Sequence, residues 1–490
     1  MAKKQTPNLD TFQLFPPILL ILYLCIGFIP NLQAVDKIAP QWLAMTVLNL
    51  ASLLTFFFYR ETLSKAISPI LSSLLLLTYI GFIAWAGLSY FYAINPTEVL
   101  VNITRQVNVL LMFLSMGILL YQMKQKRAFV SWALTLILGV EIYAVLAEAL
   151  EMVNTNGFIN SGALKGVTAN RNITAFSLAI KLPFVLYLIY NFKKGSLKIV
   201  LSALVFLTLL GLSMIQSRAS FIATGLILVS YTILHLYLYL KVERKISQLL
   251  QIGFFVIPLV LAVVVNQTVI ADKGADALSR AATISVSTDD GSINQRLRYY
   301  EDVFTHIKSN PILGTGLGNW KLKSIDYDSK DINGYVVPYH AHSDFIQLGA
   351  ELGIIGFLLY LGLFLWAVYY VYVLLRYATF SLEEKVFLFL LLVALGVYSV
   401  DANLNFPIAR PQVLVVWTAL MALIVIYYQQ YKAQIQQIKE NKKVNLLFMV
   451  LALAVLLPSL YVTNSVYKSL KGQMFLLQDF NSNQFNVPLN

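Results

Sequence analysis

Two histidines two positions apart are the residues of this 490-residue sequence best suited to acid-base chemistry. His340 and His342 lie in the stretch YHAHSDFIQLG, directly before a long apolar run, and are two of only four histidines. A neutral imidazole can take a proton from a hydroxyl near pH 7 and hold it in the transition state. An H-x-H pair can also bind a metal ion, but only carboxylates are on hand here as further ligands. We therefore expect a histidine base without a metal, and membrane-interface packing is the alternative. We interpret His235 as an interface residue and His306 as a helix-surface residue.

Arginines form the second chemically informative group. Seven of the eleven fall in segments that we expect on the same side of a membrane as the two histidines: Arg105, Arg171, Arg218, Arg280, Arg296, Arg298 and Arg410. A guanidinium group is planar, permanently charged and able to bind phosphate oxygens in pairs, so this set is suited to a pyrophosphate at a membrane surface. The alternative is that these side chains reach lipid headgroups or pair with nearby acids. Arg218 is the sharpest case, because an arginine in a short turn near hydrocarbon needs an anionic partner.

Two further charges lie inside apolar runs. Glu141 and Lys181 are seven and eight residues from the expected outer ends of their spans, which corresponds to about 10–12 Å at the helical rise of 1.5 Å per residue. At this shared depth they can form an ion pair. An intramembrane ion pair indicates either a functional site or a packing role, and both readings stay open.

The elements that position these residues are apolar helices. With 58% hydrophobic and only 12% charged residues, the chain is not typical of a soluble globule, which carries about 25% charge. Strand-like alternation is absent, and each apolar run can cross about 30 Å of hydrocarbon as a helix. We therefore expect an all-α polytopic membrane protein with about 12–13 transmembrane helices. The thirteen expected spans are 14–30, 41–58, 67–92, 107–121, 129–148, 173–191, 199–215, 220–240, 248–268, 344–375, 386–403, 411–428 and 444–463.

Lysine-rich loops set the expected orientation. KQKR at 124–127, KKGSLK at 193–198 and KVERK at 241–245 are examples of basic loops on one side of the spans, which predicts that side to be cytoplasmic. The formal net charge of +12 is then largely a topology signal, and nucleic-acid binding is not needed to explain it. The single cysteine, Cys25, lies within the first span, where a packing role is expected.

The predicted organisation has four parts. N-terminal transmembrane helices occupy 1–268, a large extracytoplasmic loop occupies 269–343, C-terminal transmembrane helices occupy 344–463, and a tail of 464–490 follows. Within the loop, apolar residues at helical spacing from Leu297 to Ile307 predict an amphipathic helix that ends at Asn310-Pro311. The following GTGLGNW lacks the preceding strand of a dinucleotide-binding site, so its glycines are expected to form a sharp turn beside the site.

Several of these motifs, in this order, resemble the O-antigen ligase and O-antigen polymerase superfamily. The elements are an outward arginine, Arg218; an R-x-x-x-aromatic motif, Arg296 with Tyr300; a proline and glycine motif from Asn310 to Asn319; and an H-x-H motif that runs from His340 to Gly356. Tyr300 stands where a tryptophan is common in the family. The resemblance is specific over residues 290–356 and loose over the remaining membrane architecture.

The resemblance implies a metal-independent, inverting glycosyltransferase in the bacterial inner membrane, with its active site facing the periplasm. The donor would be a glycan on undecaprenyl pyrophosphate, and the acceptor a hydroxyl of lipid A-core, of a glycan or of a protein. By the family pattern His342 would activate the acceptor hydroxyl with His340 in support, while Arg218 and Arg296 would hold the pyrophosphate, with Arg298 as a further candidate. A possible additional donor or acceptor site comprises Arg105, Arg171, Arg410, Glu141 and Lys181. No cofactor is expected.

Ligase-type transfer is favoured over repeat polymerisation and over protein O-oligosaccharyl transfer. The sequence contains few features that distinguish these three reactions. A membrane transporter that uses Glu141 and Lys181 as a relay is the alternative from another class. Transporters usually gather ionisable groups near the midplane, often in inverted repeats, whereas this chain concentrates its arginines and histidines in the outer segments. A non-catalytic scaffold is the third reading.

Overall fold

The computed structural model describes residues 9–282, 291–327, 339–436 and 441–481. Within these ranges the chain forms α-helices joined by short turns, and it contains no strand. The helices are α1 (Leu9–Leu24), α2 (Ile38–Phe58), α3 (Arg60–Leu71), α4 (Leu74–Leu88), α5 (Pro96–Gln122), α6 (Lys126–Asn156), α7 (Arg171–Ala179), α8 (Leu182–Asn191), α9 (Gly195–Ile215), α10 (Arg218–Tyr237), α11 (Ile246–Val265), α12 (Ala277–Ala282), α13 (Gly291–Ser309), α14 (Trp320–Lys323), α15 (Asp344–Tyr377), α16 (Leu382–Leu404), α17 (Pro411–Ile435) and α18 (Lys442–Asn481).

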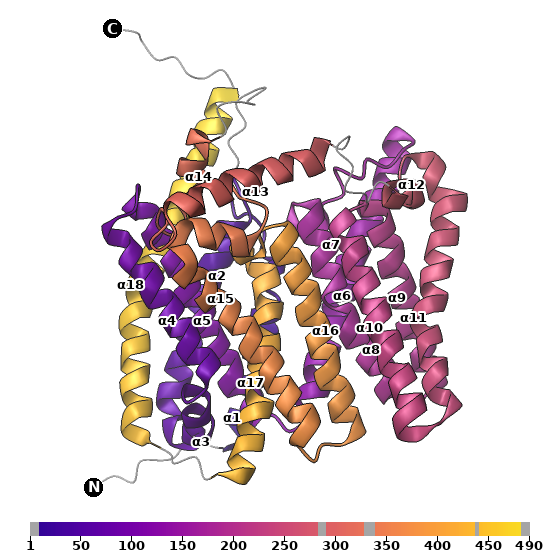
Figure 1. Cartoon of the computed structure of the whole chain (residues 1–490), viewed down its shortest axis with the longest axis horizontal. Coiled ribbons are helices and arrows are strands. Elements are labelled where there is room, and N and C mark those ends of the chain that lie inside the picture. Colours follow the sequence, from indigo (N-terminus) through magenta and orange to yellow (C-terminus); the bar gives the residue numbers. More distant parts are fainter. Residues whose placement is uncertain (1–8, 283–290, 328–338, 437–440, 482–490) are drawn as a thin grey trace.

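The helices form one bundle of membrane-spanning length (Figure 1). Twelve helical segments in the described ranges are long and apolar enough to cross a membrane, counting α7 and α8 together. The expected all-α polytopic architecture is therefore confirmed. These segments correspond to twelve of the thirteen expected spans. The remaining one, the first in the sequence, corresponds to α1, whose apolar stretch Phe15–Leu24 is shorter.

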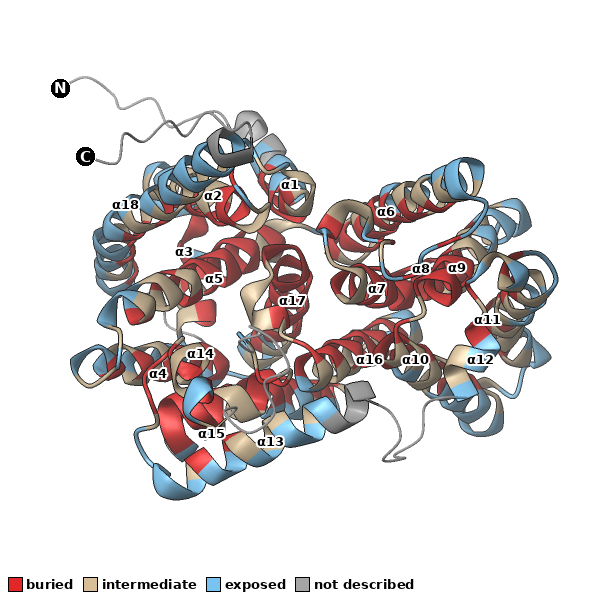
Figure 2. Ribbon diagram, turned by 90° about the horizontal axis from the view of Figure 1, so that it is seen from above, coloured by how far each residue is buried: buried red, intermediate tan, exposed pale blue. Residues whose placement is uncertain are grey.

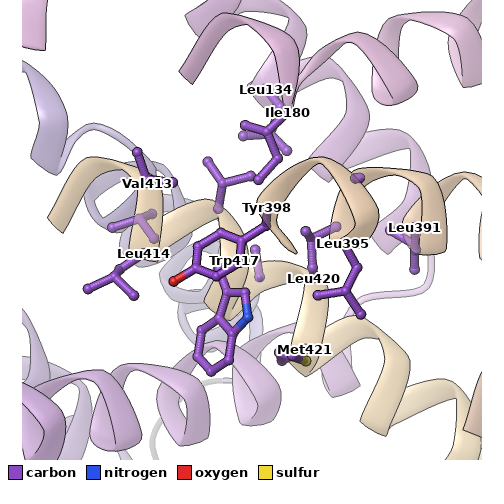
Figure 3. Packing of buried hydrophobic residues seen from close by; sticks show 14 of the residues in the cluster. Leu134, Ile180, Leu391, Leu395, Tyr398, Val413, Leu414, Trp417, Leu420 and Met421 are labelled. Atoms are coloured by element: carbon purple, nitrogen blue, oxygen red, sulfur yellow. The ribbon is translucent and has the colours of Figure 1, made fainter. Parts of the chain in front are cut away.

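Burial differs sharply between the centre and the rim of the bundle. About 94% of the apolar stretch of α17 lies inside the protein, compared with 28% for α11 and for α18. Figure 2 shows the buried residues gathered on α5, α7, α8 and α17, with exposed residues along α18 and α11. Lipid tails are as apolar as leucine, so a rim helix can turn Leu and Ile outward without the cost that water would impose. At the centre, Tyr398 packs on Trp417 with ring centroids 5.8 Å apart (Figure 3).

Local sequence signals explain several helix ends. Asn95 precedes Pro96 at the start of α5, and its side-chain oxygen accepts a hydrogen bond from the Thr97 N–H at 3.0 Å. Asn170 caps α7 in the same way. Both satisfy backbone donors that have no partner within the helix. Gly157 ends α6 in the left-handed conformation, with φ of +77°, which costs glycine little.

The expected span 67–92 is wrong as a single helix. The chain breaks at residues 72 and 73 into α3 and α4, and α3 lies at the end of the bundle away from α13 (Figure 1). The Ser73 hydroxyl accepts from the Leu76 N–H at 3.2 Å and so begins a new helix. Serines favour such caps over helix interiors because they compete for backbone donors.

The expected span 173–191 is also interrupted, between α7 and α8. Residues 180 and 181 form the break, and Pro183 follows at the second position of α8, where a missing N–H costs least. The span therefore consists of two short helices in sequence, and Lys181 sits at their junction.

The two ends of the bundle carry different segments. We call the end that carries α12, α13, α14 and the start of α15 the loop end (Figure 1). Helix α10 begins there with Arg218 and runs toward the opposite end, which carries the KVERK turn between α10 and α11. Helix α15 likewise runs from the loop end to Arg376 in its last turn. The histidine pair thus lies at the end opposite these basic turns.

Candidate active site

The histidine pair lies in the turn that leads into α15. Ser343 caps the helix by accepting from the Ile346 N–H at 3.4 Å, and His342 adopts the left-handed region with φ of +56°. This conformation is uncommon for residues other than glycine and marks a sharp change of direction. Both imidazoles contact Phe406: His340 stacks on its ring at 4.2 Å and 12°, whereas His342 meets it at 5.7 Å and 65°. Phe406 therefore links the two histidines.

Glycines hold the preceding loop tightly against α15. Gly314, Gly316 and Gly318 have φ of +66°, +94° and +76°, and Gly353 breaks the α15 geometry with φ of +64°. A Cβ on Gly353 would lie 2.0 Å from the carbonyl oxygen of Ile312, so no other residue fits without a shift of the backbone. The predicted glycine turn beside the site is confirmed. The glycine turn packs closely against α15 at the point where Gly353 kinks this helix.

Glu351 of α15 holds this loop by hydrogen bonds. Its carboxylate accepts from the N–H of Gly318 at 2.8 Å and from the side chain of Gln347 at 3.0 Å. Its backbone carbonyl accepts from the N–H of Gly316 at 2.8 Å. Because the carboxylate is almost fully buried, these donors offset the cost of removing it from water.

The loop is also joined to the turn between α4 and α5. The side-chain oxygen of Asn319 accepts from the Asn95 N–H at 2.7 Å, and Tyr92 donates to the carbonyl oxygen of Leu313 at 2.8 Å. Residues more than 200 positions apart in the sequence therefore meet at the loop end. The same contacts bring Arg105 on α5 within reach of the site.

Helix α13 crosses the loop end beside the histidines, and the amphipathic helix predicted from Leu297 to Ile307 is confirmed within it (Figure 1). The Tyr300 hydroxyl donates to the carbonyl oxygen of Asn403 at 2.9 Å and lies 3.1 Å from that of His342. The Tyr299 ring runs parallel to the His342 imidazole at 6.1 Å. Arg296 is close enough to His342 for its charge to oppose protonation of the imidazole. The R-x-x-x-aromatic motif thus lies directly against His342.

The interpretations of the other two histidines are wrong. His306 was expected on the helix surface, but it is 1% exposed, with Nδ1 3.0 Å from the Tyr327 hydroxyl and its ring against Trp320. It lies on the face of α13 that packs on the loop, which sequence spacing alone does not distinguish. His235 was expected at an interface and is fully buried, with Nδ1 2.9 Å from the side-chain oxygen of Gln248.

A cavity of about 590 Å³ opens beside His340. Its walls come from the α1–α2 turn, α5, the glycine loop, the start of α15, the turn before α17, and α18. The charged residues that line it are Asp36, Glu98, Arg105, Lys321, Asp344, Glu351 and Arg410. Lys321 and Glu98 form an ion pair at 2.7 Å. Among the described residues, no group of three or more His, Cys, Asp or Glu side chains is arranged to hold a metal ion.

Two arginines of the expected additional site meet in this cavity. Arg105 donates to the Asn102 side-chain oxygen at 3.2 Å and lies over the Trp42 ring, and Arg410 lies 5.0 Å from the centre of the Phe406 ring. In the described part of the chain neither guanidinium has a carboxylate within 4.0 Å, and Arg410 Nε is buried without a hydrogen-bond partner. Burial lowers the pKa of Arg410, which reflects this incomplete compensation of its charge.

The remaining predicted arginines lie outside the cavity wall. Arg218 is the first residue of α10, and Arg280 on α12 donates to the carbonyl oxygen of Gln216 in the turn just before it. Arg171 begins α7, and Arg298 is an exposed residue of α13. The structure therefore brings Arg105 and Arg410 to the cavity and Arg296 to His342. It also brings Arg280 to the turn that directly precedes Arg218.

The expected ion pair between Glu141 and Lys181 is confirmed. Lys181 Nζ lies 2.8 Å from a Glu141 carboxylate oxygen, and both side chains are almost fully buried. The ammonium also contacts the carbonyl and hydroxyl oxygens of Ser177 at 2.7 and 2.8 Å. Every N–H of the lysine therefore has an acceptor, at the junction between α7 and α8. Neither charge lines the cavity.

Burial keeps the imidazoles of both His340 and His342 neutral at physiological pH. It lowers the pKa of His340 to about 3, with a further contribution from the nearby Arg410 charge. It lowers the pKa of His342 to about 4, with a further contribution from Arg296. Nδ1 of each ring is buried without a hydrogen-bond partner among the described residues. A neutral imidazole is the form that accepts a proton.

Sequence reasoning missed several residues of this site. Glu351 and Asp344 lie within the motif from His340 to Gly356 and were given no role, although acids in an apolar helix are unusual enough to be informative. Glu98 and Lys321 carried no signal, because each lies in an ordinary polar setting in the sequence. Phe406 could not have been found either, since only the fold brings it to the histidines.

Fold and site together define a polytopic α-helical membrane protein with basic, acidic and imidazole groups gathered at one end of its bundle. Residues 203–361 match the family model described as O-antigen ligase. The resemblance to the O-antigen ligase and polymerase superfamily is thereby confirmed, and it implies a glycosyltransferase-type enzyme. The matched segment includes Arg218, Arg296 and both histidines, whereas Arg105 and Arg410 lie outside it. A comparison with curated proteins finds no match.

Proposed function

We propose that this protein transfers a glycan from undecaprenyl pyrophosphate to an acceptor hydroxyl at the periplasmic face of the bacterial inner membrane. The observation that carries the proposal is the position of His342, which has Arg296 and Tyr299 of α13 on one side and Phe406 on the other. His342, Arg296 and Tyr299 lie within the segment that matches the O-antigen ligase family. The lysine-rich turns at the opposite end of the bundle support the orientation.

In the proposed reaction, His342 removes the proton from the acceptor hydroxyl as its oxygen attacks the anomeric carbon. The new carbon–oxygen bond forms while the bond from that carbon to the pyrophosphate oxygen breaks, and the bonding electrons leave with the pyrophosphate. A single displacement of this kind inverts the anomeric centre. The imidazolium that results loses its proton to water and returns to the neutral form.

Arg296 and Arg218 have the proposed role of stabilising the departing pyrophosphate. Negative charge on the leaving oxygen grows as the bond breaks, so a guanidinium held near it is worth more in the transition state than in the ground state. Arg296 is close to His342, and Arg218 begins α10 next to the turn that Arg280 contacts. No metal ion is required in this scheme.

The direct test is transfer by purified protein in liposomes that contain a lipid-linked glycan. His342→Ala is expected to lower the rate by about 100-fold to 10,000-fold, the usual contribution of a general base. Arg296→Gln is expected to lower it to a similar extent, whereas Lys308→Gln, an exposed charge on the same helix, serves as the matched control and retains activity. Full activity of a folded His342→Ala variant would exclude this residue as the base.

The acceptor is proposed to be lipid A-core, in a ligase-type reaction. Deletion of the gene separates the three acceptor classes, because a ligase alters lipopolysaccharide, a polymerase alters chain length, and a protein transferase alters glycoproteins. A change confined to protein glycosylation or to polymer length would replace the ligase assignment by the corresponding member of the superfamily.

No observation favours the transporter alternative. That reading depends on a titratable relay at Glu141 and Lys181, but both charges are engaged with each other and with Ser177 in a closed arrangement. An ion pathway would require acceptors that open toward water, and neither charge lines the cavity.

A further inference from the structure

The cavity beside His340 is lined by groups suited to the hydroxyls of a sugar. Side-chain amides come from Asn102, Gln106 and Gln347, and carboxylates from Asp344 and Glu351. An amide both donates and accepts hydrogen bonds and a carboxylate accepts, so this mixture complements hydroxyl groups, which do both. The volume of about 590 Å³ falls in the range of about 300–1,000 Å³ that is usual for small-molecule sites, which leaves room for a short saccharide.

The charge of the lining favours an acceptor over the pyrophosphate of the donor. Three basic and four acidic side chains line the cavity, and two of the acids, Asp344 and Glu351, are almost fully buried, so the lining is mixed and not uniformly basic. Lys321 is already paired with Glu98. Arg105 and Arg410 remain without a carboxylate within 4.0 Å in the described chain, and Arg410 Nε is buried without a partner. Two such guanidinium groups match one acidic substituent on a sugar.

The cavity also lies beside the histidine pair, on the side of His340. His340 lines it and stacks on Phe406, and the same ring contacts His342. Arg296 and Tyr299 approach His342 from α13, and neither lines the cavity. A transferase must bring two substrates to one base, and this arrangement offers each of them its own approach.

We infer that the cavity binds the saccharide part of the acceptor and that Arg105 and Arg410 bind an acidic group on it, a phosphate or a carboxylate. The inference rests on the proposed transferase function and adds the chemical class of its second substrate. Helix α18 completes the site, because Val466, Ser469 and Leu470 form one wall.

Protection of a cysteine from a maleimide tests this assignment without any transfer reaction. Cys25→Ser removes the only native thiol, and Ser469→Cys then places a thiol of similar size on the cavity wall in the full-length protein. The probes are glucuronic acid, glucose, geranyl pyrophosphate and phosphatidylglycerol vesicles. We expect glucuronic acid to slow labelling several-fold and to bind about tenfold more tightly than glucose, the difference made by one charge-assisted contact.

The matched control is Lys468→Cys, an exposed neighbour on α18 that does not line the cavity, and its labelling should respond to none of the probes. Arg105→Gln or Arg410→Gln should remove the advantage of glucuronic acid over glucose. Protection by geranyl pyrophosphate instead would make the cavity the donor site, and protection by phosphatidylglycerol alone would make it a lipid headgroup site. Absence of protection by every probe would also overturn the inference.

The outcome is separable from that of the proposed function. A protein that transfers no glycan but shows sugar protection would contradict the transferase and leave the saccharide site standing. A protein that transfers glycan, but whose Arg105→Gln variant raises the KM of the donor and not that of the acceptor, would contradict the assignment of the cavity alone.

Discussion

His342 carries its imidazole on a backbone with φ of +56°, a conformation that costs a non-glycine residue of order 1–3 kcal/mol. The surrounding contacts must therefore hold it there. Ser343 caps α15 directly after it, and the Tyr300 hydroxyl lies 3.1 Å from its carbonyl oxygen. This turn separates the surroundings of the two imidazoles, so that His340 faces the cavity while His342 faces α13.

The pH dependence of transfer follows from the lowered pKa of His342. A base with a pKa of about 4 in the free enzyme stays neutral well below pH 6.5, so kcat/KM should be flat from about pH 5 to 8 and fall as the pH drops through about 4. An unperturbed histidine predicts that fall near pH 6.5. The measurement is a profile of kcat/KM from pH 3.5 to 8, with protein stability followed in parallel.

Donor binding should shift the pH at which the rate falls on the acid side of the profile. A bound pyrophosphate offsets the charge of Arg296 and favours the imidazolium, so the acid limb of kcat should lie at higher pH than that of kcat/KM. Identical acid limbs for kcat and kcat/KM would contradict a pyrophosphate next to His342.

The stability of the protein also depends on the protonation of His342, because the unfolded chain binds the proton near pH 6.5 and the native chain near pH 4. The free energy of unfolding therefore rises with pH between these values.

At the residue scale, the sequence drew attention to the histidine pair, the arginines and the ion pair, because each is a polar or charged group in an apolar context, and the structure confirms the ion pair. It failed where a residue gains its role only from a neighbour. His306 was expected at the surface since spacing cannot show which face of α13 a loop covers. Phe406 was overlooked because an aromatic residue before a membrane span is ordinary.

At the scale of elements, α13 acts as the support of the site. It packs on α15 and presents Tyr299, Tyr300 and Arg296 to the turn that holds His342. The hydroxyl of Tyr300 joins this turn to the end of α16 through Asn403. A helix that is anchored at two places can hold the proposed base, His342, and the proposed anion-binding group of Arg296 in a fixed relation, which catalysis by positioning requires.

Tyr300→Phe tests this role of α13. The loss of one hydroxyl removes the hydrogen bond to Asn403 and should lower transfer by about fivefold, in line with about 1 kcal/mol for a hydrogen bond. Tyr299→Phe keeps the ring parallel to His342 and should change the rate less. The assay is the same liposome transfer reaction, with the thermal midpoint of each variant as the check on folding. An equal loss of transfer in Tyr300→Phe and Tyr299→Phe would contradict a specific role of the Tyr300–Asn403 hydrogen bond.

Element boundaries were predictable where composition marks them and unpredictable where a helix breaks inside an apolar run. The expected spans matched the long apolar helices, but α3 and α4 appeared as one, as did α7 and α8. A single serine cap begins α4, and Pro183 follows the break before α8. The left-handed Gly353 within α15 was not predicted, because it faces the Ile312 carbonyl of a loop that only the fold brings near.

At the scale of the whole molecule, the Glu141–Lys181 pair stabilises the junction of α6 with α7 and α8. Lys181→Met should lower the stability by about 3–5 kcal/mol, because it leaves Glu141 buried without its partner. The double variant Glu141→Leu with Lys181→Met should recover most of that loss and retain transfer. Thermal unfolding in detergent and the transfer assay give the two readouts. A folded but inactive double variant would assign the pair a functional role.

The whole architecture was the most predictable level. Hydropathy and the position of lysine-rich loops depend on the bilayer, which acts on every span alike, so composition alone gave the class and the separation of the two ends. The cavity was not predictable. Its wall draws on six separate parts of the chain, and nothing in the local sequence of Asp36 or Val466 indicates that these residues meet.

Helix α18 has 40 residues, which corresponds to about 60 Å and is roughly twice the hydrocarbon thickness of a bilayer. Its upper part rests on the turn after α1, where Tyr467 donates to the carbonyl oxygen of Leu32 at 2.9 Å. The ribosome makes α18 after all the other described helices, yet α18 supplies a wall of the cavity. A nascent chain that has reached α17 still lacks this wall, so the order of synthesis places completion of the cavity after the addition of α18.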